Sequence, residues 1–122
     1  MQAAISALHA GAPTPEATDW PQIAALYDSL ARMTPSLVVE VNRAVAYAMA
    51  SGPQIGLQML LRLAAQLDDY YPYHAALADL LRRNNQPQPA AAAYQRALAL
   101  CGNRAERAYL QRRLDEMLAL AA

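Results

Sequence analysis

The chain has 122 residues, of which 56% are apolar and 16% charged, so it has the composition of one folded domain and not of a disordered tail. Ten basic and ten acidic residues give a formal net charge of zero, which argues against a surface that attracts nucleic acid or an anionic membrane by charge alone. A single cysteine, Cys101, excludes an internal disulfide and a multi-cysteine metal site, and four glycines leave none for a phosphate-binding loop.

Alanine and leucine dominate the composition, and turn signals divide the chain into seven predicted helices. The first covers about residues 2–10. Asp19 is the expected N-cap of the second helix, and Pro35 precedes the third. Pro53 opens the fourth helix, whose apolar positions continue in helical spacing as far as Leu67.

The remaining three helices have similar boundary signals. Either Asp68 or Asp69 is expected to cap the fifth helix, and Pro87 opens the sixth. Gly102 suits the left-handed position after the sixth helix, and Asn103 is the expected cap of the seventh. No strand pattern competes with these helices, so the sequence predicts an all-α fold of antiparallel helical hairpins.

A fixed shift along the chain places the third and fourth predicted helices on the fifth and sixth. This shift carries Gly56 onto Ala90 and Leu60 onto Tyr94. The period, about 34 residues, is that of the tetratricopeptide repeat (TPR), so the fold is predicted to be a TPR-like, right-handed superhelical stack of hairpins. Gly56 and Ala90 are expected where the two helices of a hairpin cross closely, because a larger side chain would wedge them apart.

This repeat divides the single domain of residues 1–122 into four parts. Residues 1–34 would form an opening hairpin, residues 37–70 and 71–104 two degenerate TPR units, and residues 104–122 a capping helix. The residues expected to have structural roles in packing this stack are Trp20, Tyr27, Gly56, Ala90 and Tyr94.

The sequence holds no convergent set of catalytic groups. Its two histidines, His9 and His74, are far apart, and motifs for metal ligation or nucleophilic catalysis are missing. Cys101 lies on an apolar helical face, where core packing is its expected role. We therefore expect no enzyme, no cofactor and no bound metal.

The first helix of each predicted unit would line the concave side of the stack. In the first unit this helix is apolar, with Val38, Val41, Val45 and Met49, whereas in the second unit it is charged. Such a groove suits an amphipathic peptide or helix, unless the last helix folds back and fills it. The candidate partner-binding residues are His74, Asp79, Arg82 and Arg83 on the charged helix, together with Tyr70, Tyr71 and Tyr73 around its start.

Two basic clusters and a polar pair in the third predicted helix allow either a binding role or a structural one. Arg82 and Arg83 form one basic cluster, and residues 104–113 carry another. The first cluster complements a helix dipole and acidic residues interleave with the second, so no direct DNA contact is expected. Asn42 and Arg43 either face solvent or hold a neighbouring segment by hydrogen bonds.

An ordered series of short motifs resembles the C-terminal extension of one group of extracytoplasmic-function (ECF) RNA polymerase sigma factors. The series covers nearly the whole chain, and its specificity lies in the order of the pieces. The pieces are Gln2–Ile5, Ala7–Ala10, Thr18–Ile23, Leu26–Asp28, Pro35-Ser36, Val38-Val39, Asn42–Ala46, Gly52-Pro53, Gly56-Leu57, His74-Ala75, Asp79–Arg83, Ala93-Tyr94, Arg96–Leu100, Asn103, Ala105–Arg107 and Leu110–Leu114.

The resemblance implies a TPR-like domain that regulates or supports sigma activity through protein contacts. Its partners would be core RNA polymerase or the promoter-binding regions of the sigma factor, and the family supplies no catalytic residue. The chain itself has no segment like those promoter-reading regions, so we expect it to be a C-terminal fragment that does not bind a promoter alone. Residues 84–87, Asn-Asn-Gln-Pro, replace the glycine-bearing turn that is frequent in the family.

Two other interpretations stay open. The chain could be a free-standing TPR-like adaptor that binds a peptide in its concave groove, or a small-molecule sensor that uses its tyrosines. No apolar run is long enough to span a bilayer and no signal peptide is present, so we expect a cytoplasmic protein without membrane contact. Its expected state is a monomer or a weak dimer that pairs through the ends of the stack.

Overall fold

The computed structural model describes residues 18–122, which are helical and contain no strand. Six helices lie in this range, so the all-α prediction is confirmed for it. The predicted helix at residues 2–10, which would bring the number to seven, lies outside the described residues. The helices are α2 (Trp20–Met33), α3 (Leu37–Ser51), α4 (Pro53–Leu61), α5 (Tyr71–Arg83), α6 (Pro87–Leu100) and α7 (Arg104–Ala121).

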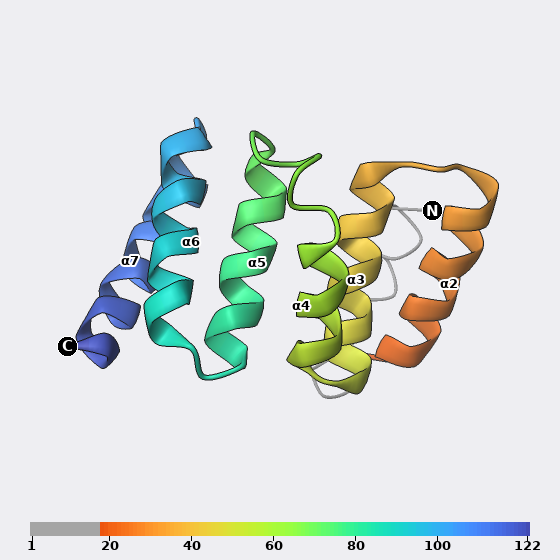
Figure 1. Cartoon of the computed structure of the whole chain (residues 1–122), viewed down its shortest axis with the longest axis horizontal. Coiled ribbons are helices and arrows are strands. Elements are labelled where there is room, and N and C mark those ends of the chain that lie inside the picture. Colours follow the sequence, from red (N-terminus) through yellow and green to blue (C-terminus); the bar gives the residue numbers. More distant parts are fainter. Residues whose placement is uncertain (1–17) are drawn as a thin grey trace.

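The six helices stand side by side in chain order, with α2 at one end of the row and α7 at the other (Figure 1). Each helix packs against the next one along the chain, and consecutive helices run in opposite directions. Helix α3 also touches α5, although α4 lies between them in the chain. This contact brings the first helices of the two predicted units together.

Three helices begin at the side-chain caps that hydrogen-bond their first turn. The carboxylate of Asp19 accepts from the Gln22 amide at 3.1 Å, and Asn103 accepts from the Glu106 amide at 3.0 Å, as the sequence predicts. Ser36 caps α3 in the same way. Pro53 and Pro87 each occupy the first position of a helix, where the missing N–H costs nothing.

The fourth helix is shorter than predicted. It ends at Leu61, and residues 62–69 form successive turns instead of a continued helix. Several amides here bond three residues back, as Leu63 does to the Leu60 carbonyl. Leu67 is nevertheless buried, and it packs in the same core cluster as Leu57 and Leu60. Core packing of the connection thus overrides the helical period of its sequence.

The expected carboxylate cap of α5 is wrong. Its N-cap residue is Tyr70, which makes no side-chain capping bond. The carboxylates of Asp68 and Asp69 lie instead within 3.5 and 3.2 Å of the Arg96 guanidinium on α6. A partner distant in sequence therefore replaces the local cap.

The expected left-handed glycine after α6 is also wrong. The cap residue Cys101 is extended, and positive φ angles in residues 18–122 occur at Gly52 and Asn85. The Arg107 side chain donates to the carbonyls of Leu98 and Cys101, so a guanidinium satisfies the end of α6 without a left-handed turn.

Within residues 18–122 the core consists of three clusters arranged along the row. The first joins α2 to α3, the second joins α3, α4 and α5, and the third joins α5, α6 and α7. Gly56 lies in the second, where α4 crosses α3. A Cβ atom on Gly56 would lie 2.5 Å from the Ala48 Cβ and 2.7 Å from the Ala44 carbonyl oxygen, so the two helices meet at van der Waals distance.

Candidate functional site

A surface hollow of about 270 Å³ opens between α3 and α5. Val45 and Met49 form its α3 wall, and Trp20 from the start of α2 closes one side. The α5 wall combines two apolar with two charged side chains. These are Ala76, Asp79, Leu80 and Arg83.

The two walls of the hollow use positions related by the repeat. Asp79 and Arg83 are the repeat equivalents of Val45 and Met49. The hollow thus lies between the two helices that were predicted to line a groove, with an apolar α3 wall and a half-charged α5 wall. Two of its expected apolar residues are elsewhere, because Val41 is buried in the core and Val38 is exposed outside the lining. The lining contains no residue of α7, so the last helix does not fill this hollow.

Asp79 is held in place by side chains from three helices. Its Oδ1 accepts hydrogen bonds from the hydroxyls of Tyr94 on α6 and Tyr109 on α7, the latter at 3.0 Å. Arg82 places one guanidinium nitrogen 4.0 Å from the same oxygen and donates another to the Tyr94 hydroxyl at 3.1 Å. Burial and the Asp79 carboxylate raise the pKa of Tyr94, so its hydroxyl keeps its proton.

Arg83 differs from its neighbour Arg82. Its side chain is exposed at the rim of the hollow and makes no hydrogen bond or ion pair with the described residues. The acidic side chain one turn away, Asp79, is occupied by Tyr94, Tyr109 and Arg82. Of the predicted partner-binding residues, Asp79 and Arg83 thus line the hollow, and Arg82 acts in the network that holds Asp79.

His74 and Tyr73, two of the candidate partner-binding residues, are buried and do not face the surface. Tyr73 is 2% exposed in the second core cluster, and His74 is 8% exposed. The His74 Nε2 donates to the Asp68 carbonyl at 2.7 Å, and its ring meets Tyr73 edge-on. The position of His74 in its helix does not by itself show whether the side chain lines a groove or hydrogen-bonds to the segment that precedes α5.

Tyr70 and Tyr71 are half-buried and lie outside the hollow. Burial and the nearby Glu106 carboxylate raise the pKa of Tyr71. The tyrosines of residues 70–73 therefore do not converge with Asp79 and Arg83 on one surface site.

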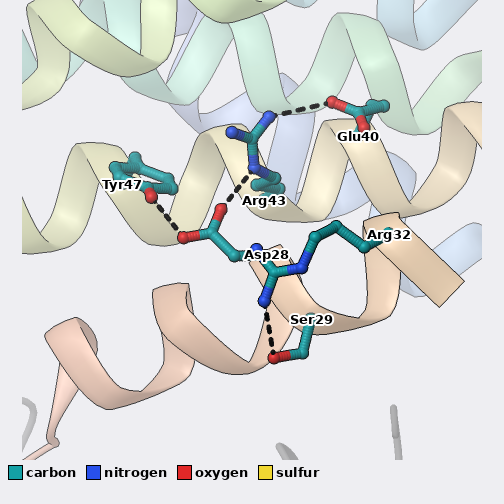
Figure 2. Close-up of polar contacts among 6 residues, drawn as sticks. All are labelled: Asp28, Ser29, Arg32, Glu40, Arg43 and Tyr47. Carbon is teal, nitrogen blue, oxygen red and sulfur yellow. Dashed lines mark hydrogen bonds and ion pairs between the residues drawn. The ribbon is translucent and has the colours of Figure 1, made fainter.

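A second polar cluster connects α2 to α3 (Figure 2). Arg43 Nε lies 2.7 Å from one carboxylate oxygen of Asp28, and the Tyr47 hydroxyl donates to the other. Arg43 also reaches Glu40 at 3.2 Å, and its guanidinium lies 5.4 Å from the centre of the Tyr47 ring. Burial raises the pKa of Asp28, but the bonds from Tyr47 and Arg43 outweigh it and leave the pKa below its usual value.

This cluster was not predicted from the sequence. Arg43 was expected to face solvent or to hold a neighbour, and the structure shows that it holds Asp28 on the preceding helix. The available signal was the spacing of Glu40, Arg43 and Tyr47, which puts all three on one helical face. Asp28 itself gives no such signal, because its partners are 15 and 19 residues away.

The residues expected to pack the stack occupy three different places. Tyr27 is buried between α2 and α3, and Trp20 is half-buried against the same cluster while it lines the hollow. Gly56 is at the crossing of α3 and α4, and Ala90 and Tyr94 are fully buried between α5 and α6. Any contact of Trp20 with the predicted first helix lies outside the described residues.

Residues 18–122 contain neither a metal-binding cluster nor a membrane-spanning helix. Within that range no three side chains of His, Cys, Asp or Glu gather closely enough to hold a metal ion. Within the same range no helix is both long and apolar enough to cross a membrane.

The chain is similar to an uncharacterized protein of Rhizobium meliloti (strain 1021). The two are 44% identical over 119 residues, which cover 98% of this chain and 28% of that protein. The chain thus spans less than a third of the length of this relative. No protein-family model matches the sequence, and no solved structure gives a significant match.

Proposed function

We propose that this chain is a protein-interaction domain of an ECF-type sigma factor, and that it regulates transcription initiation. It would dock on the promoter-binding regions of the sigma factor or on core polymerase and shift the population of the promoter-competent form. It would act in the bacterial cytoplasm, without direct DNA contact by this domain. The motivating sequence feature is the ordered series of motifs from Gln2 to Leu114.

One structural observation carries the interaction role. Helices α3 and α5 begin at repeat-equivalent positions, Leu37 and Tyr71, and helices α4 and α6 do so at Pro53 and Pro87. The hollow between α3 and α5 is lined by positions in this same register. A TPR-like stack of two repeated hairpins presents such a surface to other proteins.

The relative from Rhizobium meliloti agrees with a regulatory extension. Its region similar to this chain makes up 28% of a much longer protein, so there the sequence occurs alongside further chain. An extension that acts on sigma regions requires such additional sequence.

Run-off transcription with the complete factor that carries this sequence tests the proposal. Removing the domain should change promoter-dependent output by about tenfold or more, while output from a promoter-independent, tailed template should stay the same. Equal promoter-dependent output with and without the domain would reject the sigma role.

A free-standing TPR-like adaptor is the second candidate, and the half-apolar hollow favours it. The two candidates differ in their targets. A regulatory extension should bind core polymerase or the sigma regions supplied as separate proteins, whereas an adaptor should bind neither. The length of the complete reading frame separates them further, because an adaptor needs no promoter-reading regions.

A further inference from the structure

We propose that the hollow between α3 and α5 binds one amphipathic helix of a partner protein, which places an aliphatic side chain against Val45 and Met49 and a carboxylate against Arg83. This inference rests on the proposed protein-interaction role and names the chemistry of the partner. The hollow is lined by Val45, Met49, Ala76, Leu80, Asp79, Arg83 and Trp20.

The apolar part of the hollow calls for an aliphatic occupant. Val45 and Met49 are half-buried, and Leu80, only 2% exposed, forms the base of the α5 wall. These side chains come from two helices that touch each other, so the apolar surface is continuous across the α3–α5 interface. Covering such surface with an aliphatic side chain releases the water that it orders.

The charge at the rim selects an acidic partner. Asp79 has its negative charge offset by Arg82 and its Oδ1 occupied by two tyrosine hydroxyls. Arg83 carries a positive charge that no acidic group within residues 18–122 contacts. The rim of the hollow therefore offers one uncompensated guanidinium, whose planar donors fit a carboxylate.

The spacing of these groups matches a helix. Val45 and Met49 are one helical turn apart on α3, and Asp79 and Arg83 are one turn apart on α5. A partner helix that lies along α3 and α5 presents side chains at the same interval. An aliphatic residue and an acidic residue three or four positions later then reach the apolar surface and Arg83, respectively. Residues 18–122 contain no strand, so a partner segment cannot bind here by adding a strand to a sheet.

Selection from a displayed library of 16-residue helical peptides on the 122-residue chain tests this inference. We expect the enriched peptides to carry Asp or Glu one turn from Leu, Ile or Met. A synthetic consensus peptide, measured by fluorescence anisotropy, should bind Arg83→Glu about tenfold more weakly and Val45→Asp at least about thirtyfold more weakly. A Glu→Lys version of the peptide should regain affinity for Arg83→Glu.

Arg104→Glu is the matched control. Arg104 is also exposed and without a polar partner among the described residues, but it lies at the start of α7 and outside the hollow. This variant should bind the peptide within about twofold of the parent. Circular dichroism must show the parent helix content in all three variants.

Three results would overturn the inference. The first is enrichment of peptides that carry no acidic residue, and the second is an unchanged affinity of the consensus peptide for Arg83→Glu. The third is a concentration-dependent dimer that Val45→Asp abolishes, which would assign the hollow to a second copy of the chain. If the chain binds acidic helical peptides but promoter-dependent transcription is the same with and without the domain, only the sigma role is rejected. If transcription depends on the domain but no acidic helical peptide binds, only this inference is rejected.

Discussion

Hairpins α3–α4 and α5–α6 begin at equivalent positions of the repeat, but different kinds of side chain occupy equivalent positions in them. Leu60 and Tyr94 occupy equivalent positions, and both are 0% exposed. Val45 and Asp79 are likewise equivalent. The first hairpin therefore has two apolar groups where the second has a tyrosine hydroxyl bonded to a carboxylate. A shared backbone register does not require shared side-chain chemistry.

The hairpins also differ in how closely their helices approach. Gly56 in the first hairpin leaves no room for a methyl group, whereas the equivalent Ala90 in the second carries one and is fully buried. The two pairs of helices thus meet with different small residues at the same register position.

The largest expected effect tests this close approach. Gly56→Ala should lower the free energy of unfolding by about 2 kcal/mol, because its methyl group would collide with the Ala44 carbonyl and the Ala48 Cβ. This loss should occur although alanine favours a helix over glycine by about 1 kcal/mol. Urea denaturation followed by circular dichroism measures the change.

Ala90→Gly is the matched control in the other hairpin. It removes a buried methyl group and weakens the helix, so it should also destabilise, by about 1 kcal/mol. If Gly56→Ala instead stabilised the protein, the first hairpin would be no more closely packed than the second.

The second prediction concerns the hydrogen bonds that the Tyr94 hydroxyl makes in the second hairpin. Tyr94→Phe should lower the free energy of unfolding by about 1.5 kcal/mol, since it removes a donor to Asp79 Oδ1 and an acceptor for Arg82. Tyr70→Phe should change it by less than about 0.5 kcal/mol, because the Tyr70 hydroxyl has no hydrogen-bond partner among the described residues. Equal effects of Tyr94→Phe and Tyr70→Phe would show that the hydrogen bonds of the Tyr94 hydroxyl do not stabilise the second hairpin.

The link from the first hairpin to α2 depends on the charge of Asp28. Asp28→Asn should cost about 1 kcal/mol at pH 7, because the ion pair with Arg43 is lost. The pKa of Asp28 is lowered in the folded state, so its stabilisation is complete above the unfolded value of about 3.9 and is lost as the pH falls through the folded value. The difference between parent and variant should therefore shrink as the pH falls below about 3.9, and a difference that stayed constant with falling pH would show that the charge is not responsible.

The smallest expected effect concerns the link from the second hairpin to residues 62–70. Arg96→Gln removes ion pairs with Asp68 and Asp69, both of which are exposed. The free energy of unfolding should fall by no more than about 0.5 kcal/mol, and the loss should shrink in 0.5 M salt. A larger, salt-independent loss would mean that the Arg96 bond to the Asp68 carbonyl dominates.

Helix starts were predictable from the sequence to a greater extent than helix ends. Asp19, Asn103, Pro53 and Pro87 act on their own first turns, so their roles follow from local spacing. The end of α4 at Leu61 has no such local signal, because the apolar spacing of the sequence continues to Leu67, which is buried beyond the helix.

The candidate site shows the same division. The sequence placed Val45, Met49, Asp79 and Arg83 on facing helices through the repeat, and all four line the hollow. The sequence did not predict that Trp20 lines the hollow or that His74 is buried, because each of these depends on contacts with residues of other segments.

The sequence by itself determined the helical class, the capped and proline-initiated helix starts and the register of the repeat, since each depends on groups a few positions apart or on a fixed period. Only the tertiary structure decided which charges are compensated. Asp79 and Arg83 are one turn apart, yet the hydroxyls of Tyr94 and Tyr109 from two later helices occupy the carboxylate of Asp79. Among the described residues the Arg83 guanidinium therefore contacts no acidic group.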